Sequence, residues 1–303
     1  MLEESKLAKM ERAQYRVVGN HSAVKVCLWT KECLRGGRSC YKNSFYGIST
    51  ARCMEMSPAL TCNQRCLHCW RDTSIFSKDW NAPVDEPDKI ITGCIEARKK
   101  LLTGFKGNDK TSLKLFEQAV EPVQVAISLT GEPCMYPKLP QLIKRFFERG
   151  FESVYLVTAG TVPEMLKKLK PLPTNLYISL TATNPEMYKK LCLPVIEGAW
   201  EKVMESLELM RKMKTATVLR LTLIKGLNME KPEDFAPLVK KAMPKFIECK
   251  AYMFLGCSRK RLKSENMPEM KDIRLFAKAL AKATGYKVKD EREDSRVVLL
   301  KKP

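Results

Sequence analysis

Short apolar runs alternate with longer amphipathic segments from residue 54 onward, and this alternation limits the folds open to the chain more than any other feature. The runs are rich in Val, Ile, Leu and aromatic residues and too short for helices, so they predict strands. These strands lie at Met54–Leu60, Val123–Leu129, Ser153–Thr158, Asn175–Leu180, Thr217–Ile224 and Phe246–Phe254. Helices are predicted at Asp88–Phe105, Lys110–Val120, Pro137–Arg149, Val162–Lys168, Pro185–Leu191, Ala199–Met213 and Pro232–Ala242. This alternation predicts an α/β fold, an incomplete (β/α)6 TIM-like barrel, with an open doubly wound sheet as the alternative.

The stretch 61–71, TCNQRCLHCWR, directly follows the first predicted strand. In it Cys62, Cys66 and Cys69 form a C-x3-C-x2-C array, so their thiolates can converge on one inorganic centre. Structural zinc and ordinary iron–sulfur sites usually take four protein ligands, whereas three thiolates on a four-iron cluster would leave one iron open. Loops after parallel strands lie at one rim, where active sites sit. The array therefore predicts a metal centre at that rim, with a closed zinc site that includes His68 as the alternative.

The chain carries a formal net charge of +20, from 54 Lys and Arg against 34 Asp and Glu. An excess of this size attracts a polyanion, and nucleic acid is the first candidate, although a basic surface without a binding role gives the same count. The run Ser258–Lys263, SRKRLK, concentrates that charge before a predicted helix at Met270–Thr284. A last apolar run, Val297–Leu300, predicts an edge strand.

Twelve cysteines occur in a chain whose N-terminal stretch is charged and lacks the apolar segment of a secretory signal. No apolar run approaches the ~20 residues needed to span a bilayer. We therefore expect a reducing, cytoplasmic setting in which thiols bind metal, and no membrane partner.

The N-terminal segment, where a helix is expected near Glu3–Tyr15, contains a second group of cysteines. Cys27, Cys40 and Cys53 are separated by twelve residues each time. Spacing this wide favours buried apolar thiols over a metal site.

A C-x3-C-x2-C array after a strand is the signature of radical S-adenosylmethionine (SAM) enzymes, and the chain resembles that superfamily from the array onward. The resemblance implies a [4Fe-4S] cluster held by Cys62, Cys66 and Cys69, with SAM bound to the open iron through its amino and carboxylate groups. Reductive cleavage of SAM would release a 5′-deoxyadenosyl radical, which abstracts hydrogen from unactivated carbon.

Two further segments resemble the motifs that bind SAM in this superfamily. SLTGEPCMYP, at 128–137, is similar to the glycine–glutamate motif, in which glycine lets the backbone approach and the carboxylate meets the ammonium group. RLTLIKGLN, at 220–228, is similar to the segment that contacts the carboxylate and ribose, with strand-end capping as the alternative role. The implied cofactor-binding residues are Thr130, Gly131, Glu132, Pro133, Arg220 and Asn228. Ala159 and Thr181 stand where relatives usually carry Asn and Asp.

Blocks at both ends of the chain narrow the resemblance. HSAVKVC (21–27), SCYKNSFYGI (39–48) and RCMEMSP (52–58) are similar to N-terminal blocks of the archaeal tRNA 4-demethylwyosine synthase family, and KAYMFLGCSRKRL (250–262) and EDSRVVLL (293–300) to its C-terminal blocks. The resemblance implies that Cys27, Cys40 and Cys53 hold a second [4Fe-4S] cluster, against the expectation from their spacing. It also implies that Lys42 engages pyruvate through a Schiff base.

The implied reaction condenses pyruvate carbons with N1-methylguanosine-37 of phenylalanine tRNA (tRNA-Phe) to give tricyclic 4-demethylwyosine. The resemblance implies that the enzyme is a monomer. It also implies that an external protein of the flavodoxin or ferredoxin type donates the electron. Residues that suit phosphate contacts are Arg259, Lys260, Arg261 and Lys263. Two alternatives remain: another radical SAM enzyme with an auxiliary cluster, and a non-catalytic iron–sulfur or zinc RNA-binding protein.

The expected organisation has three parts packed as one unit. An N-terminal extension over 1–53 carries the auxiliary cluster ligands, a radical SAM partial barrel spans 54–256, and a basic C-terminal extension spans 257–303.

Overall fold

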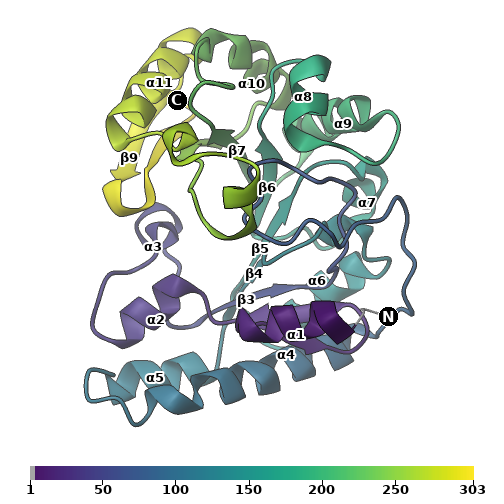
Figure 1. The fold of residues 1–303 in the computed structure, drawn as a ribbon, viewed down its shortest axis with the longest axis vertical. Coiled ribbons are helices and arrows are strands. Elements are labelled where there is room, and N and C mark those ends of the chain that lie inside the picture. The colour runs from purple at the N-terminus through teal and green to yellow at the C-terminus, as the bar shows by residue number, and fades with distance from the viewer. Residues whose placement is uncertain (1–3) are drawn as a thin grey trace. The chain divides into compact units, whose positions relative to one another are not determined.

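The computed structural model describes residues 4–303, which form two compact units built from interleaved segments (Figure 1). The first unit contains residues 4–61 together with 80–156 and 168–174. The second unit contains 62–79, 157–167 and 175–303. Each unit has its own group of strands and its own covering helices.

The first unit has five strands in the order β1-β2-β3-β4-β5. The β1–β2 and β2–β3 pairs are antiparallel, and the β3–β4 and β4–β5 pairs are parallel. The strands are β1 (Arg16–Val18), β2 (Ser22–Lys25), β3 (Cys53–Ser57), β4 (Gln124–Ile127) and β5 (Ser153–Thr158), of which β5 has its first four residues in this unit. The helices are α1 (Glu4–Arg12), α2 (Leu28–Leu34), α3 (Tyr41–Tyr46), α4 (Pro87–Leu102), α5 (Leu113–Val120) and α6 (Leu139–Glu148), with short 3-10 helices η1 (Thr103–Phe105) and η2 (Pro133–Met135).

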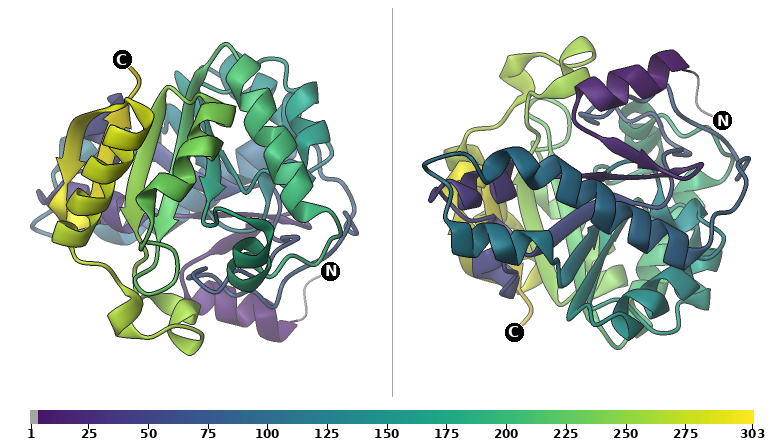
Figure 2. Two further views of the ribbon diagram at one scale, coloured as in Figure 1. Left: turned by 90° about the horizontal axis from the view of Figure 1, so that it is seen from above. Right: turned by 90° about the horizontal axis from the view of Figure 1, so that it is seen from below.

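Helix α4 is the main cover of the first unit. It packs on β1 and β2 and touches α5 and α6. Its buried residues Ile91, Cys94, Arg98 and Leu102 recur at helical spacing, so one face of the helix points into the core. The right panel of Figure 2 shows α4 and α5 crossing this side of the unit.

The second unit has five strands in the order β6-β7-β8-β10-β9. The β6–β7 and β7–β8 pairs are parallel, and β10 pairs antiparallel with β8 and with β9. The strands are β6 (Asn175–Leu180), β7 (Ala216–Leu223), β8 (Phe246–Ala251), β9 (Lys287–Arg292) and β10 (Val297–Lys301). The helices are α7 (Pro163–Lys168), α8 (Pro185–Cys192), α9 (Ala199–Lys212), α10 (Ala236–Ala242) and α11 (Met270–Thr284), with short 3-10 helices η3 (Pro232–Phe235), η4 (Gly256–Lys260), η5 (Ser264–Asn266) and η6 (Glu293–Ser295).

Helices α9, α10 and α11 cover the strands of the second unit. α10 packs between α9 and α11, and α11 lies on β8, β9 and β10. The left panel of Figure 2 shows α10 and α11 side by side over these strands. Helix α11 is followed by Gly285, whose φ of +77° gives the left-handed turn that stops many helices.

The predicted α/β fold with mainly parallel strand pairing is confirmed. All six predicted strands are present, with ends shifted by up to three residues, and the helix predicted at Met270–Thr284 has those bounds in the structure. The expected first helix spans Glu4–Arg12, and Glu3 lies outside the described residues. The run Val297–Leu300 forms a strand, but the prediction of an edge strand is wrong, because β9 pairs on its outer side.

Strand β9 escaped prediction because its sequence, KVKDER, contains a single apolar residue. Its side chains are mostly exposed, so it has no apolar face for a pattern to reveal. Within residues 4–303, no helix has the length and apolar character needed to cross a membrane.

Candidate metal and cofactor site

The cysteine loop, residues 62–79 of the second unit, is pinned to the C-terminal end of α8. The Arg65 N–H donates to the Cys192 carbonyl at 3.1 Å, and the Leu67 N–H donates to the Leu191 carbonyl at 2.9 Å. These two bonds fix the backbone on either side of one cysteine of the array. The loop therefore holds its thiols in defined positions although it has little regular secondary structure.

Arg261 holds the same loop from another side. Its Nε donates to the Leu67 carbonyl at 3.2 Å, its Nη2 donates to the Cys69 carbonyl, and its Nη1 donates to Thr73 Oγ1 at 3.3 Å. Burial and the neighbouring Cys66 raise the pKa of the Cys69 thiol to about 11, and the charge of Arg261 acts in the opposite direction. A positive charge beside the loop favours the thiolate form that binds metal.

His68 is the candidate for an additional ligand in a zinc site. Burial, with the charge of Arg261 as a second cause, lowers the pKa of His68 to about 4, so its ring is neutral at pH 7. Its Nδ1 is buried and makes no hydrogen bond to any of residues 4–303.

The donors of the cysteine loop fit an iron–sulfur cluster. Across the described part of the chain, no three His, Cys, Asp or Glu side chains are placed to hold a single metal ion. A four-iron cluster has a separate iron for each thiolate, so its ligands need not converge on one point. Cys62, Cys66 and Cys69 supply three soft sulfur donors from one short loop, which is the chemistry that such a cluster uses.

The turn Thr130–Pro133 packs against the residues that precede the cysteine array. Gly131 has a φ of +68°, and a Cβ there would stand 2.0 Å from the Ala59 carbonyl oxygen and 2.6 Å from that of Thr61. Only glycine fits this position. The Glu132 N–H donates to the Thr61 carbonyl at 2.8 Å, and its buried carboxylate accepts a hydrogen bond from the start of η2. The turn is therefore fixed against the chain one residue before the array.

Asn228 caps the end of β7. Its Nδ2 donates to the carbonyls of Thr181, at 2.7 Å, and Thr222, at 2.9 Å, and its Oδ1 accepts from the Ile224 N–H at 2.7 Å. The side-chain amide of Asn228 thus donates both its hydrogens to backbone carbonyls. This is the strand-end capping role that the sequence analysis gave as the alternative. The contact at Thr181 uses the backbone carbonyl, so it does not depend on the side chain at that position.

Arg220 lies across the parallel strands of the second unit. Its Nε donates to Glu248 Oε2 at 2.8 Å, and its guanidinium stands 4.7 Å from the centre of the Tyr177 ring. Glu248 is fully buried, so the arginine compensates a charge that would otherwise be costly inside the protein.

The first unit brings together the three cysteines of the N-terminal segment. Cys27 and Cys40 are the residues at the N-terminal caps of α2 and α3, and Cys53 begins β3. The Cys40 N–H donates to Thr50 Oγ1 at 3.1 Å, and Thr30 Oγ1, which contacts Cys27 Sγ, donates to the Thr50 carbonyl at 3.0 Å. Burial, followed by the neighbouring Cys27, raises the pKa of the Cys53 thiol to about 12.

Lys42 lies on α3, beside these thiols. Its charge acts on Cys53, and its Nζ stands 5.8 Å from the centre of the Tyr155 ring. The structure thus places Lys42 in the same group as Cys27, Cys40 and Cys53.

Arg98 is a member of this group that the sequence interpretation missed. It is fully buried; its Nε donates to the Ala119 carbonyl at 2.9 Å and its Nη2 to the Ala51 carbonyl at 2.8 Å. Its Nη1 makes no hydrogen bond to any described residue, and its charge acts on Cys53 and Cys27. The sequence signal for its burial is its position, because Arg98 falls among the apolar residues that recur at helical spacing on the buried face of α4.

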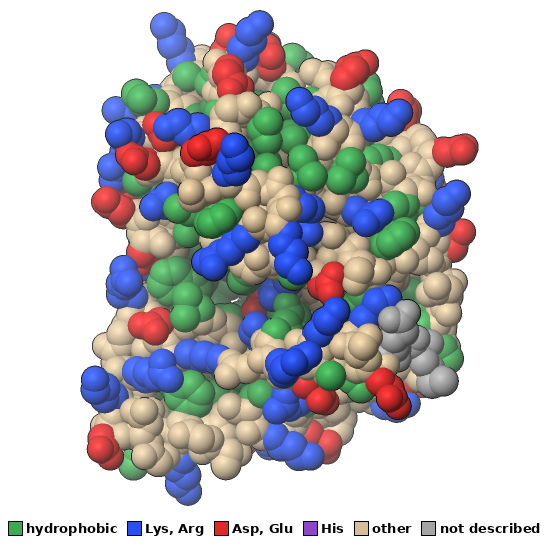
Figure 3. All heavy atoms as spheres, in the orientation of Figure 1, with side chains coloured by type: hydrophobic (Ala, Val, Ile, Leu, Met, Phe, Trp, Pro, Cys, Tyr) green, Lys and Arg blue, Asp and Glu red, His purple; other side chains and the backbone are tan. Residues whose placement is uncertain are grey.

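The basic residues predicted to contact RNA have different environments. Arg261 serves the cysteine loop, Arg259 Nε donates to the Phe254 carbonyl at 3.1 Å, and Lys263 is exposed beside Glu265. Lys260 is exposed. Figure 3 shows Lys and Arg side chains spread over one face of the molecule, with Asp and Glu between them.

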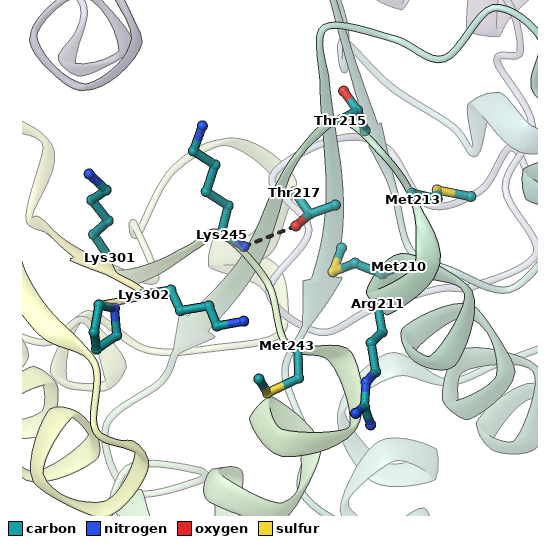
Figure 4. Close-up of a pocket in the computed structure, with 10 residues that line it drawn as sticks. Met210, Arg211, Met213, Thr215, Thr217, Met243, Lys245, Lys301 and Lys302 are labelled. Atoms are coloured by element: carbon teal, nitrogen blue, oxygen red, sulfur yellow. Dashed lines mark hydrogen bonds between the residues drawn. The ribbon is translucent and has the colours of Figure 1, made fainter.

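A basic hollow in the second unit lies apart from these residues (Figure 4). Thr217, near the start of β7, accepts from the N–H of Lys245, which directly precedes β8, so the hollow is at the N-terminal ends of these strands. The remaining lining residues are Met210, Arg211, Met213, Thr215, Met243, Lys301, Lys302 and Pro303. The hollow includes none of the predicted site residues.

Comparison with known proteins identifies relatives over nearly the whole chain. The model of the radical SAM superfamily matches residues 56–239, and a model described as wyosine base formation matches residues 241–302. A protein of Pyrococcus abyssi named S-adenosyl-L-methionine-dependent tRNA 4-demethylwyosine synthase is 49% identical in an alignment that covers 97% of this chain and 88% of the relative.

Two solved structures have the same fold. A structure of TYW1 with a lysine–pyruvate adduct bound has a TM-score of 0.90 and 36% identity, and covers 99% of this chain and 96% of its own. A crystal structure of archaeal TYW1 has a TM-score of 0.82 and 32% identity, with the same coverage of both chains. The chain therefore belongs to the radical SAM superfamily and, within it, to the tRNA 4-demethylwyosine synthase family.

Proposed function

We propose that this enzyme joins carbons of pyruvate to N1-methylguanosine-37 of tRNA-Phe and closes the third ring of 4-demethylwyosine. The observation that carries the proposal is the group formed in the first unit by Lys42 and the thiols of Cys27, Cys40 and Cys53. A relative that is 36% identical to this chain has been solved with a lysine–pyruvate adduct. Lys42, on α3, lies beside these thiols, and its charge acts on Cys53.

Lys42 binds pyruvate covalently. Its ε-amine adds to the keto carbon, water leaves, and the Schiff base ties the substrate to α3. The ring of Tyr155 lies beside this amine and limits where the adduct can extend. Cys27, Cys40 and Cys53 hold the second [4Fe-4S] cluster, and the buried guanidinium of Arg98 balances negative charge at that position.

Cys62, Cys66 and Cys69 hold the first [4Fe-4S] cluster. When bound, this cluster supplies the electron that cleaves SAM to a 5′-deoxyadenosyl radical. The turn Thr130–Pro133 receives the methionine part of SAM, because Gly131 lets the backbone approach and Glu132 offers a carboxylate to the ammonium group. Arg220 and Asn228 support the strand ends that meet the carboxylate and ribose.

The target base leaves its stack beside the anticodon to reach the radical. Hydrogen abstraction from its N-methyl group would give a carbon radical that adds to the pyruvate held on Lys42. The carboxyl carbon would leave as formate or carbon dioxide, and the amino group of the guanine would displace the Lys42 amine as the ring closes. Phosphates of the folded RNA meet the basic run, in which Arg259, Lys260 and Lys263 contact RNA directly. Arg261 contributes charge while it anchors the cysteine loop.

The proposed function also implies how the chain is divided into parts. The strands from 54 to 256 form an incomplete (β/α)6 barrel, with the auxiliary-cluster extension over 1–53 and the basic extension over 257–303. The enzyme acts as a cytoplasmic monomer and receives electrons from a flavodoxin or ferredoxin.

A turnover assay with tRNA containing N1-methylguanosine-37 and labelled pyruvate tests the proposal. The reconstituted, reduced enzyme should transfer label to the tRNA and should contain iron and sulfide for two clusters. SAM cleavage without transfer of label would favour another radical SAM enzyme, and the absence of SAM cleavage would favour an RNA-binding protein without catalysis.

The Lys42→Ala variant tests the covalent step. It should still cleave SAM but lose the tricyclic product by at least about 100-fold, because the group that captures pyruvate is gone. Reduction with borohydride in the presence of labelled pyruvate should label the natural chain and not this variant. Lys25→Ala is the matched control, since Lys25 lies over the Tyr15 ring, 4.6 Å from its centre, in the same unit. Undiminished product from Lys42→Ala would overturn the Schiff-base role.

A further inference from the structure

Cys192 is a buried thiol that none of the steps above uses, and it ends the helix on which the cysteine loop rests. The Leu67 N–H donates to the Leu191 carbonyl at 2.9 Å, and Gln64 forms an antiparallel bridge with Pro194. The loop and the end of α8 therefore run past each other as a short antiparallel pair.

The register of this pair places Cys66 opposite Cys192. Moving two residues from Gln64 along the loop reaches Cys66, and moving two residues back from Pro194 reaches Cys192. The N–H groups on either side of Cys66, those of Arg65 and Leu67, donate to the carbonyls of Cys192 and Leu191, so the backbones of the two cysteines lie beside each other, as a disulfide requires.

The side chains agree with the register. The Cys192 thiol is a hydrogen-bonding partner of the Cys66 thiol, and both thiols are free in this structure. Cys66 is partly exposed whereas Cys192 is buried, so a reagent from solution meets Cys66 first. Cys66 is therefore the thiol that a reagent can reach, and Cys192 is the thiol that can resolve a mixed disulfide.

We propose that Cys66 and Cys192 form a reversible disulfide when the loop holds no cluster and a disulfide oxidant is present. This inference rests on the proposed role of Cys66 as a cluster ligand. Oxidation then withdraws that ligand, and reduction returns it, so that cluster assembly waits for reducing conditions. The disulfide also protects Cys66 from irreversible oxidation to the sulfinic acid.

The oxidant is a small-molecule disulfide such as oxidised glutathione. The Cys66 thiolate attacks one of its sulfurs, a mixed disulfide forms, and the first glutathione leaves as a thiol. The Cys192 thiolate then attacks the Cys66 sulfur and displaces the second glutathione. The two protein thiols lose two electrons and two protons, and the glutathione disulfide gains both.

Peptide mapping of the cluster-free chain tests this step. After treatment with oxidised glutathione and digestion with trypsin without reduction, the peptide 66–71, CLHCWR, should be joined to the peptide 191–202, LCLPVIEGAWEK. Fragmentation should place the link on Cys66 rather than Cys69. The link should be absent after treatment with dithiothreitol. A link from Cys66 to Cys62 or Cys69, or free thiols at Cys66 and Cys192, would overturn the proposal.

Iron uptake supplies a second readout. The oxidised natural chain should take up less iron than the reduced chain, by the content of one four-iron cluster. Oxidised Cys192→Ser should instead keep glutathione on Cys66, because no second thiol displaces it, and mass spectrometry should detect the adduct. Cys249→Ser is the matched control, because Cys249 is a buried thiol of the same unit, and it should behave like the natural chain. Equal uptake by oxidised and reduced natural chain would count against the proposal. The crosslink is measured without turnover, so an inactive enzyme that forms it would refute only the proposed function.

Discussion

At the scale of single residues, two positions admit no common substitute. Gly131 combines a left-handed backbone with carbonyl oxygens where a side chain would begin. Arg98 is fully buried and its guanidinium serves two backbone carbonyls in the first unit. Neither requirement is visible in the composition, because each depends on what the folded chain places around the residue.

Substitution of Gly131 by Ala should destabilise the protein and abolish binding of SAM. The left-handed conformation alone costs an alanine about 1–2 kcal/mol, and the Cβ would also have to displace the carbonyl of Ala59 from a distance of 2.0 Å. Gly150→Ala is the matched control, because Gly150 has a φ of +82° with nothing within 4 Å of the added Cβ. Urea unfolding and equilibrium dialysis with SAM measure the two effects. Equal losses of stability in the two variants would contradict the steric argument.

At the scale of elements, prediction succeeded where an element carries its own signal. Helix α11 has an apolar face, an N-terminal capping box at Glu269 and Asp272, and Gly285 after its end, so its bounds follow from local sequence. The cysteine loop has the opposite character. Its position depends on Arg261, which lies far along the chain in the sequence, and no local pattern reveals that contact.

The role of Arg261 in the loop leads to a prediction that separates it from its neighbour Lys260. Arg261→Ala should weaken retention of the cluster by Cys62, Cys66 and Cys69, because it removes hydrogen bonds to the carbonyls of Leu67 and Cys69. Lys260→Ala should keep the iron content and lower the affinity for tRNA a few-fold. The slope of the logarithm of that affinity against the logarithm of salt concentration should become smaller in magnitude by about one. Iron quantitation and tRNA titration at several salt concentrations check both. Loss of iron in Lys260→Ala, or none in Arg261→Ala, would show that the assignment is wrong.

At the scale of the whole molecule, the sequence was a better guide to the type of chemistry than to which distant residues meet in the fold. The C-x3-C-x2-C array and the turn at Gly131 have recognisable local spacing, whereas Cys27, Cys40 and Cys53 are too far apart for spacing to indicate that they meet. Their proximity results from the packing of α2, α3 and β3, which is a property of the folded unit. The resemblance to a family supplied what the spacing could not.

Both histidines of the chain make the folded protein sensitive to acid. His21 Nδ1 donates to the Pro58 carbonyl at 2.6 Å, and its Nε2 accepts from the Asp85 N–H at 2.9 Å, so two backbone groups hold the neutral ring. Burial lowers the pKa of His21, against the opposing charge of Asp85 and with a small contribution from Lys89. Because the pKa is lower in the folded state, the unfolded chain binds the proton first, and stability is lost as pH falls below about 6.5.

Thermal unfolding of the cluster-free chain from pH 7.5 to pH 5 should therefore show a falling midpoint. In His21→Gln the midpoint at pH 7.5 should be lower, because the ring contacts are lost, but its slope against pH should be smaller. His68, whose pKa is lowered to about 4, contributes in the same direction, so the double variant with His68→Gln should be nearly flat. The Asp85 carboxylate, whose pKa is also lowered, affects stability only at more acidic pH, below about 4. An unchanged slope in the double variant would mean that carboxylates, not the two buried histidines, cause the loss of stability between pH 7.5 and pH 5.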